Sequence, residues 1–131
     1  MNYNIIDVIN SLADKSDDFF SKGEVDSSKI AQSEESLGVN FSKDFWKYTQ
    51  KFGYIEVDGM ELCGVVDSRH VSTVIRTQNM RELFSDFPMD CYVIESVGID
   101  NAVMVQKPDG KIYQFLSKIL YLCTSFRTKT Q

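Results

Sequence analysis

The sequence is poor in the residues that build metal sites and disulfide frameworks. It contains one histidine, His70, and three cysteines, Cys63, Cys91 and Cys123, with no C-x-x-C pair among them. A histidine-rich metal site is therefore impossible, and an odd number of widely spaced cysteines is typical of neither a disulfide framework nor a zinc site. We expect reduced, partly buried thiols and no bound metal or cofactor.

Long hydrophobic runs are missing as well. No apolar run reaches the roughly 18 residues that a membrane span needs. The N-terminal stretch MNYNIIDVIN has neither the basic start nor the cleavage site of a signal peptide, so we expect a cytoplasmic protein. With 131 residues, 43% of them hydrophobic and 25% charged, the composition is that of an ordinary globular protein. This length predicts a single domain over residues 1–131.

A surplus of basic residues is also absent, and the charge is distributed unevenly along the chain. Residues 1–66 carry 6 Lys and Arg against 12 Asp and Glu, a net charge of −6, whereas residues 67–131 carry 8 against 7. Phosphate contacts need Lys and Arg, so the acidic first half disfavours nucleic acid and anionic membranes as ligands. It favours a basic partner through electrostatic steering, although an acidic surface can also serve solubility alone.

Apolar residues at helical spacing predict three helices in the first half of the chain. The first covers about residues 3–14, the second begins at Asp26 or Ser27 and ends at Gly38, and the third runs from the N-cap Ser42 to Gly53. Residues 14–28, between the first two helices, predict a loop. Phe19 and Phe20 are expected to fold back from this loop onto the core.

One carboxylate falls inside the apolar stripe of the second helix. Glu34 lies between Ile30 and Leu37 on that stripe, where an unpaired carboxylate would be costly. We expect Glu34 to bind backbone N–H groups or an arginine rather than a ligand.

A β-hairpin is predicted directly after the third helix, where the spacing of apolar residues changes to two. The dipeptide Asp58-Gly59 stands between the alternating runs YIEV and MELCGV, which is the strongest short signal for a two-residue type I′ turn. In this register four apolar side chains share one face, with Ile55 opposite Leu62 and Val57 opposite Met60.

The same register places Glu56 directly opposite Glu61 on the other face, beside Asp58 at the tip. Like charges in this position cost about a few tenths to 1 kcal/mol. Either the face is simply solvated, or the carboxylates await a basic partner; the sequence leaves both readings open. If a partner binds, we expect Glu56, Asp58 and Glu61 to contact it, with Asp67 and Asp100 as further candidates.

The second half alternates between one helix and several strands. The run VSTVIRTQNMRELF, residues 71–84, predicts a helix starting near Ser72, and CYVIESV, AVMVQK and KIYQFL predict antiparallel strands, the last two joined by a turn at residues 108–110. Helices first, then strands broken by one helix, is the order of an α+β domain. We expect an antiparallel sheet of about five to six strands, with the N-terminal helices and one inserted helix packed on it.

Catalytic arrangements find little support in the sequence. A thiol nucleophile at Cys63 would need His70 as its base and Asp67 or Glu61 to orient that base, yet Cys63 lies in a strand among apolar neighbours. A glycosidase-like pair could be drawn from Glu56 and Glu61, but nothing in the sequence separates their acidities. The glycines are scattered caps and turns that form no phosphate loop. We therefore expect no enzyme activity.

The order of the residues in KIAQSEESLGVNFSKDFWKYTQKFGYIEVDGMELCGV resembles the signature of the SUKH superfamily, the SMI/KNR-type domain named in part for yeast cell-wall synthesis regulators. The matching positions are Ile30, Glu34, Leu37-Gly38, Phe41-Ser42, Phe45, Tyr48, Gly53, Leu62 and Gly64. The later runs VIRTQNMRE and CYVIES also resemble bacterial members, so the similarity covers about residues 3–116. Ser42 stands where the family usually has proline, and only RTKTQ follows Ser125-Phe126, where members often continue into a final helix.

This resemblance implies a function by binding. Bacterial members are mostly immunity proteins, made beside secreted polymorphic toxins that are often nucleases, and they inhibit by binding the toxin. The resemblance therefore implies a cognate toxin as the partner, and a basic nuclease would suit the acidic first half. A different possibility is an adaptor resembling the yeast regulators. The sequence leaves the oligomeric state open.

Overall fold

The computed structural model of the chain describes residues 5–96, 102–116 and 119–123. Its helices are α1 (Ile5–Lys15), α2 (Ser27–Leu37), α3 (Lys43–Phe52) and α4 (Thr73–Leu83), with a short 3-10 helix, η1 (Arg69–Val71), before α4. The four α-helices lie where the sequence predicts them, and the ends that can be compared shift by one or two residues at most. Residues 3 and 4, expected at the start of the first helix, lie outside the described residues. The turn expected around residues 98–101 lies outside the described residues.

Polar side chains start three of these helices. The carboxylate of Asp26 accepts a hydrogen bond from the Ser28 backbone N–H at 3.2 Å. The hydroxyl oxygens of Ser42 and Ser72 accept from the N–H groups three residues on, each at 3.1 Å. These bonds satisfy backbone donors that the first helical turn leaves without partners. The predicted caps at Asp26 and Ser42 are confirmed.

The described strands form two antiparallel sheets. The first has the order β1 (Phe19–Ser21), β2 (Ile55–Val57), β3 (Met60–Leu62), and the second has the order β4 (Tyr92–Ser96), β5 (Val103–Gln106), β6 (Ile112–Leu116), β7 (Ile119–Cys123). The Cys63 backbone N–H donates to the Ile94 carbonyl at 2.8 Å and joins the two sheets. The α+β class is confirmed, and the strands divide between two sheets where the sequence predicted one.

Strand β1 corrects the expectation of a loop over residues 14–28. Phe19 faces Val57 and Ser21 faces Ile55 in an antiparallel pair. Three residues are too few to show a period in the sequence, and the partner strand lies far along the chain. Phe19 packs against the core as expected, but Phe20 is 49% exposed and points to the opposite face of the sheet.

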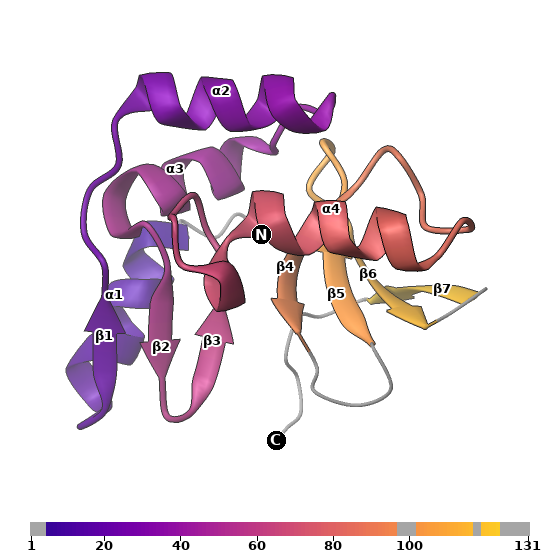
Figure 1. Cartoon of the computed structure of the whole chain (residues 1–131). Helices are drawn as coiled ribbons and strands as arrows, with labels where there is room; N and C mark the ends of the chain where they lie inside the picture. Colours follow the sequence, from indigo (N-terminus) through magenta and orange to yellow (C-terminus); the bar gives the residue numbers. More distant parts are fainter. Residues whose placement is uncertain (1–4, 97–101, 117–118, 124–131) are drawn as a thin grey trace.

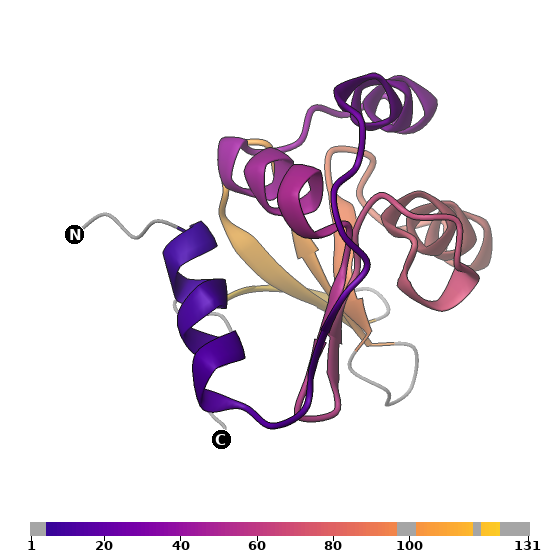
Figure 2. The same cartoon turned by 90° about the vertical axis from the view of Figure 1, so that its left-hand side faces the viewer.

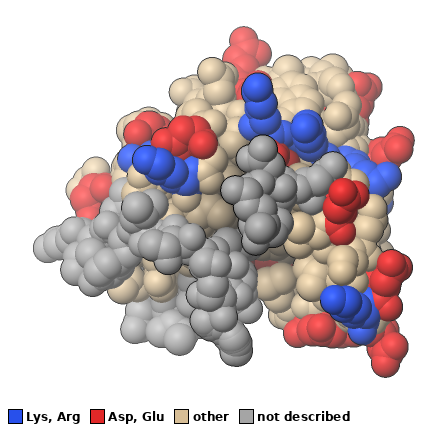
Figure 3. All heavy atoms as spheres, turned by 180° about the vertical axis from the view of Figure 1, so that it is seen from behind, with Lys and Arg blue, Asp and Glu red and all other residues tan. Residues whose placement is uncertain are grey.

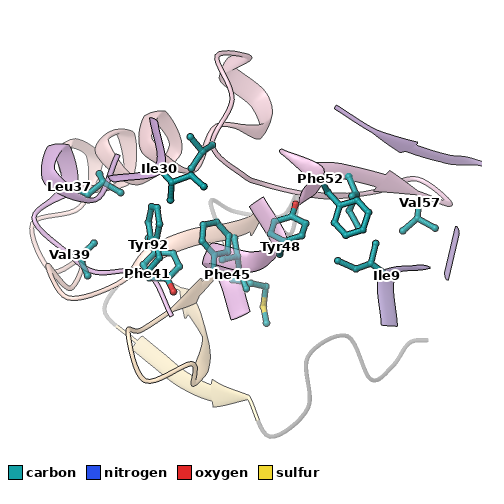
Figure 4. Packing of buried hydrophobic residues seen from close by; sticks show 14 residues of the cluster. Ile9, Ile30, Leu37, Val39, Phe41, Phe45, Tyr48, Phe52, Val57 and Tyr92 are labelled. Carbon is teal, nitrogen blue, oxygen red and sulfur yellow. The ribbon is translucent and has the colours of Figure 1, made fainter. Parts of the chain in front are cut away.

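Helices lie on both sides of the sheets. In Figure 2, α1 and α3 lie on one side and α4 on the other, and Figure 1 shows α4 in front of β4 and β5 while α2 crosses above α3. One core cluster fills the space around α1, α2, α3 and β2, and Figure 4 shows its aromatic centre at Phe41, Phe45 and Tyr92. A second cluster around Met80, Phe87 and Phe115 lies beneath α4.

Buried polar contacts fix the start of α3 against the second sheet. The Ser42 backbone N–H donates to the Tyr92 hydroxyl oxygen at 2.8 Å, and the Tyr92 and Ser42 hydroxyls both donate to Gln106 Oε1, at 3.0 and 3.2 Å. Glu34 Oε2 accepts from the Phe41 backbone N–H at 2.8 Å. The prediction that Glu34 binds a backbone N–H group is thus confirmed.

Candidate partner-binding surface

The hairpin of β2 and β3 has the predicted register. Ile55 pairs with Leu62, Glu56 with Glu61 and Val57 with Met60. Asp58 and Gly59 have φ angles of 51° and 84°, the left-handed values that a type I′ turn requires at both central positions. The apolar residues of the hairpin pack towards the core around α1 and α3. Its other face is therefore the one presented away from that core.

This outer face combines carboxylates with aromatic rings. Phe20 of β1 pairs with Glu56, which pairs in turn with Glu61, so these three side chains form a row across the first sheet. Glu61 and Phe20 are exposed and Glu56 is half-buried. The two carboxylates project from neighbouring strands of a paired sheet, which presents them on a rigid support.

Tyr54 connects this row to the rest of the surface. Its hydroxyl donates to Glu56 Oε2 at 3.0 Å, and its ring centroid lies 5.8 Å from that of Phe20. Partial burial raises the pKa of Tyr54, and the hydrogen bond to Glu56 and the charges of Glu56 and Glu61 raise it further. The phenol therefore stays protonated at neutral pH and remains a donor to Glu56.

The hairpin tip is more acidic than the sequence indicated. The Asp58 carboxylate accepts from the Ser16 hydroxyl at 2.7 Å, and the Asp58 backbone N–H donates to the Asp18 carbonyl at 3.0 Å. These bonds bring the exposed residues Asp17 and Asp18 beside Asp58. Figure 3 shows many acidic side chains over the side of the molecule that carries α1 and β1. Asp17 and Asp18 could not be assigned to this tip from the sequence, because the pattern of residues 14–28 predicts an unpaired loop there.

An open groove of about 710 Å³ adjoins Phe20 and Tyr54. Residues of α2 and of the start of α4 line it, together with residues of the segments that precede these helices. Aliphatic side chains from the loops and from α4 line it together with charged and hydroxyl side chains. Its lining residues are Phe20, Lys22, Glu24, Val25, Asp26, Lys29, Gln32, Ser33, Ser36, Tyr54, Val65, Val66, Asp67, Ser68, Ser72, Val74 and Ile75.

Four of the five residues predicted to contact a partner lie in the described part of the chain. Glu56 and Glu61 face each other on the hairpin, and Asp58 lies at its tip. Asp67 is exposed but lines the groove instead of the hairpin face. Asp100 lies outside the described residues. No pattern in the sequence indicated the groove, because segments distant along the chain form it.

Cys63 and Cys91 are buried and poorly acidic. Burial raises the pKa of Cys63 to about 12, and the same cause raises the pKa of Cys91 to about 12. The thiolate is the nucleophilic form, so neither side chain is activated at neutral pH. His70, which a thiol mechanism would use as its base, is exposed on η1. The geometry therefore gives no support to a thiol nucleophile at Cys63.

In the part of the chain that the structure describes, no group of three or more His, Cys, Asp or Glu side chains is arranged to hold a metal ion. No helix among those residues combines the length and the hydropathy that a membrane crossing needs.

The fold and this surface define a small α+β domain with helices on both sides of its antiparallel sheets and an exposed carboxylate row next to an open groove. Its sequence matches the family SUKH_5, described as SMI1-KNR4 cell-wall, over residues 5–125. The chain belongs to this SUKH family, as the order of its residues indicated. No curated protein matches the chain.

Proposed function

We propose that the protein is an immunity protein that binds a secreted polymorphic toxin in the cytoplasm and neutralises it. The toxin is a basic nuclease, and the immunity protein inhibits it by covering the active site, without any enzymatic activity of its own. Membership of a SUKH family supports this role. The observation that carries it is the opposed pair Glu56 and Glu61 on a rigid hairpin.

The carboxylate pair suits a cationic active site. Nuclease clefts attract phosphates with Lys and Arg, and carboxylates can take the place of those phosphates. Glu56 and Glu61 repel each other in the free protein, and a cationic partner would remove that repulsion on binding. Asp17, Asp18 and Asp58 extend the negative surface to the hairpin tip, which strengthens the attraction over distance.

The proposal predicts a toxin domain encoded in a reading frame beside this gene, and the test uses that domain. The two proteins are produced together, and cell growth, complex formation and nuclease activity are measured as the amount of the immunity protein rises. We expect inhibition to be complete when the two are present in equal amounts, since inhibition by occupancy needs one inhibitor per toxin. Residual nuclease activity at a large excess of the immunity protein would contradict the proposal.

A second candidate is an adaptor resembling the yeast cell-wall synthesis regulators. The description of the matching family as SMI1-KNR4 cell-wall favours it. An adaptor would bind a signalling or structural protein and would leave the activity of the neighbouring gene product unchanged. Affinity capture from the source cells with and without that gene separates the two candidates, because an immunity protein loses its principal partner when the gene is deleted.

A further inference from the structure

We propose that the groove between α2 and α4 receives a protruding segment of the partner protein that carries an arginine beside aliphatic side chains. This inference rests on the proposed function for the identity of the partner as a basic toxin. It adds a second contact, because the hairpin carboxylates lie on the outer face of the sheet and the groove lies next to them.

The size and floor of the groove suit a short extended segment. Its volume of about 710 Å³ falls in the range of about 300–1,000 Å³ that is usual for specific binding sites. Five aliphatic side chains line it, namely Val25, Val65, Val66, Val74 and Ile75. Aliphatic side chains of a bound segment would cover these apolar surfaces and remove them from water, which favours binding.

The aromatic pair at one end of the groove favours a planar cation. Phe20 is 49% exposed, and its ring lies 5.8 Å from the ring of Tyr54 at an angle of 54°, so both rings can be reached from the groove. A guanidinium group stacks favourably on such rings because their faces carry partial negative charge. Arginine suits this position better than lysine because its flat, weakly hydrated head group can stack and still donate hydrogen bonds.

Two carboxylates near the aromatic pair can form an ion pair with that cation. Asp67 lines the groove, and Tyr54 links the groove to Glu56 through its hydroxyl. Lys107 and Asp90 form an ion pair that involves neither Asp67 nor Glu56, and among the described residues no lysine or arginine is paired with either carboxylate. Lys22 and Lys29 also line the groove, but the carboxylates of Glu24, Asp26 and Asp67 outnumber them.

The hairpin carboxylates and the groove would act on different steps of binding. The row of Glu56 and Glu61 and the acidic tip attract the partner from a distance, since exposed charges act mainly on the rate of association. The groove holds the segment after contact, and its loss would act mainly on the rate of dissociation. Tyr54 belongs to both surfaces because it contacts Glu56 and lines the groove.

The test needs no toxin. The isotope-labelled full chain is titrated with the capped peptide acetyl-Val-Arg-Val-amide, and amide chemical shifts are followed by NMR. The control peptide carries citrulline in place of arginine, which keeps the shape and removes the charge. We expect saturable shifts at Phe20, Tyr54 and Asp67, with affinity about fivefold higher for the arginine peptide, the effect of about 1 kcal/mol.

Two variants and two matched controls locate the site. Phe20→Ala and Asp67→Asn should each lower the affinity for the arginine peptide by about fivefold. Leu83→Ala removes another exposed hydrophobic side chain, 64% exposed, and Asp86→Asn another exposed carboxylate, and neither residue lines the groove. We expect both controls to bind like the parent protein.

Several results would overturn the inference. Equal affinity for the citrulline peptide, an absence of shifts at the groove, or equal losses in the control variants would each show that no arginine binds there. Shifts at Phe20 and Tyr54 that depend on protein concentration without any peptide would show that a second copy of the chain fills the groove instead. If the groove binds the arginine peptide but the protein does not inhibit the neighbouring toxin, the proposed function fails and the groove remains an arginine site.

Discussion

The backbone of Gly64 lies against the carbonyl group of Gly53 so closely that a Cβ atom on Gly64 would collide with the Gly53 oxygen. Thr49 holds the two segments together, since its hydroxyl donates to the Gly53 carbonyl at 2.9 Å and accepts from the Val65 N–H at 2.8 Å. Both glycines belong to the pattern by which the sequence resembles the SUKH superfamily. Their spacing in the chain therefore reflects a close approach of two backbones.

Substitution of Gly64 by alanine should therefore destabilise the protein strongly. The clash is with backbone atoms that cannot rotate away, so we expect Gly64→Ala to lower the free energy of unfolding by about 3 kcal/mol or more. Gly110→Ala is the control: Gly110 has a φ of 92° but open space around it, and we expect a loss of about 1 kcal/mol from backbone strain alone. Urea unfolding measures both, and equal losses would show that the close approach of Gly53 and Gly64 is not what matters.

Glu34 should act on stability through its hydrogen bond to Phe41. Glu34→Ala leaves the Phe41 N–H in a partly buried place without its acceptor, and we expect a loss of about 1–3 kcal/mol. Glu34→Gln keeps an acceptor oxygen and should lose less. Thermal unfolding of the two variants tests this, and binding of the partner should stay unchanged in both. A loss of binding at full stability would show that Glu34 contacts the partner.

Ser42 is expected to contribute more to stability than a residue that only caps a helix. Its hydroxyl accepts from the Phe45 N–H and donates to Gln106, and the residue is buried. Ser42→Ala should lower the free energy of unfolding by about 1–2 kcal/mol without affecting partner binding. Tyr92→Phe, which removes another acceptor from the same network, should cost a similar amount. A double variant that loses less than the sum of the two single losses would show that the residues are coupled.

The hairpin carboxylates should affect association more than stability. Glu56→Gln with Glu61→Gln removes the repulsion between them and keeps an acceptor for the Tyr54 hydroxyl, so folding should be unchanged or slightly more stable. Association with the toxin should slow, and its rate should depend less on salt. Stopped-flow measurements at low and high salt provide the readout. A double variant that associates and protects cells like the parent at both salt concentrations would place the interface elsewhere.

Alkaline pH should destabilise the protein through its buried thiols. Burial raises the pKa of Cys91 from its ordinary value of 9.0 to about 12, so the thiol stays protonated when folded but ionises when unfolded. Its contribution to stability is complete below about pH 9 and is lost as the pH rises towards 12, by about 1.4 kcal/mol per pH unit for each such group. Cys63 behaves in the same way. Cys91→Ala should flatten the decline of the unfolding free energy between about pH 9 and pH 11, and an unchanged slope would contradict this.

Local patterns predicted the helices and the hairpin correctly because their signals are local. Asp26 and Ser42 precede apolar runs with helical spacing, and Asp58-Gly59 separates two alternating runs, so neighbouring residues alone specify these elements. Strand β1 has no such signal. Its three residues become a strand because β2 offers them hydrogen-bonding partners more than thirty positions later in the chain.

The candidate surface was predicted only in part for the same reason. The register of the hairpin fixes Glu56 opposite Glu61, and this followed from the sequence. The positions of Phe20 beside Tyr54 and of Asp18 beside Asp58 depend on how β1 pairs with β2. The groove that Asp67 lines depends on how α2 and α4 approach each other, which no short stretch of sequence encodes.

The sequence by itself determined the class of fold, the family, the caps of the helices and the face of the hairpin that carries the carboxylates. The caps and the hairpin face rest on residues within a few positions of one another, and the fold class and the family rest on the order of such local elements along the chain. Only the tertiary structure decided that the strands divide into two sheets joined through Cys63 and Ile94, and that Phe20 remains exposed beside an open groove. Those features result from contacts between segments that are distant in the sequence. Such contacts form because burial of apolar surface, for example that of α4, stabilises the fold, and the face of β1 and β2 that no helix covers stays in contact with solvent.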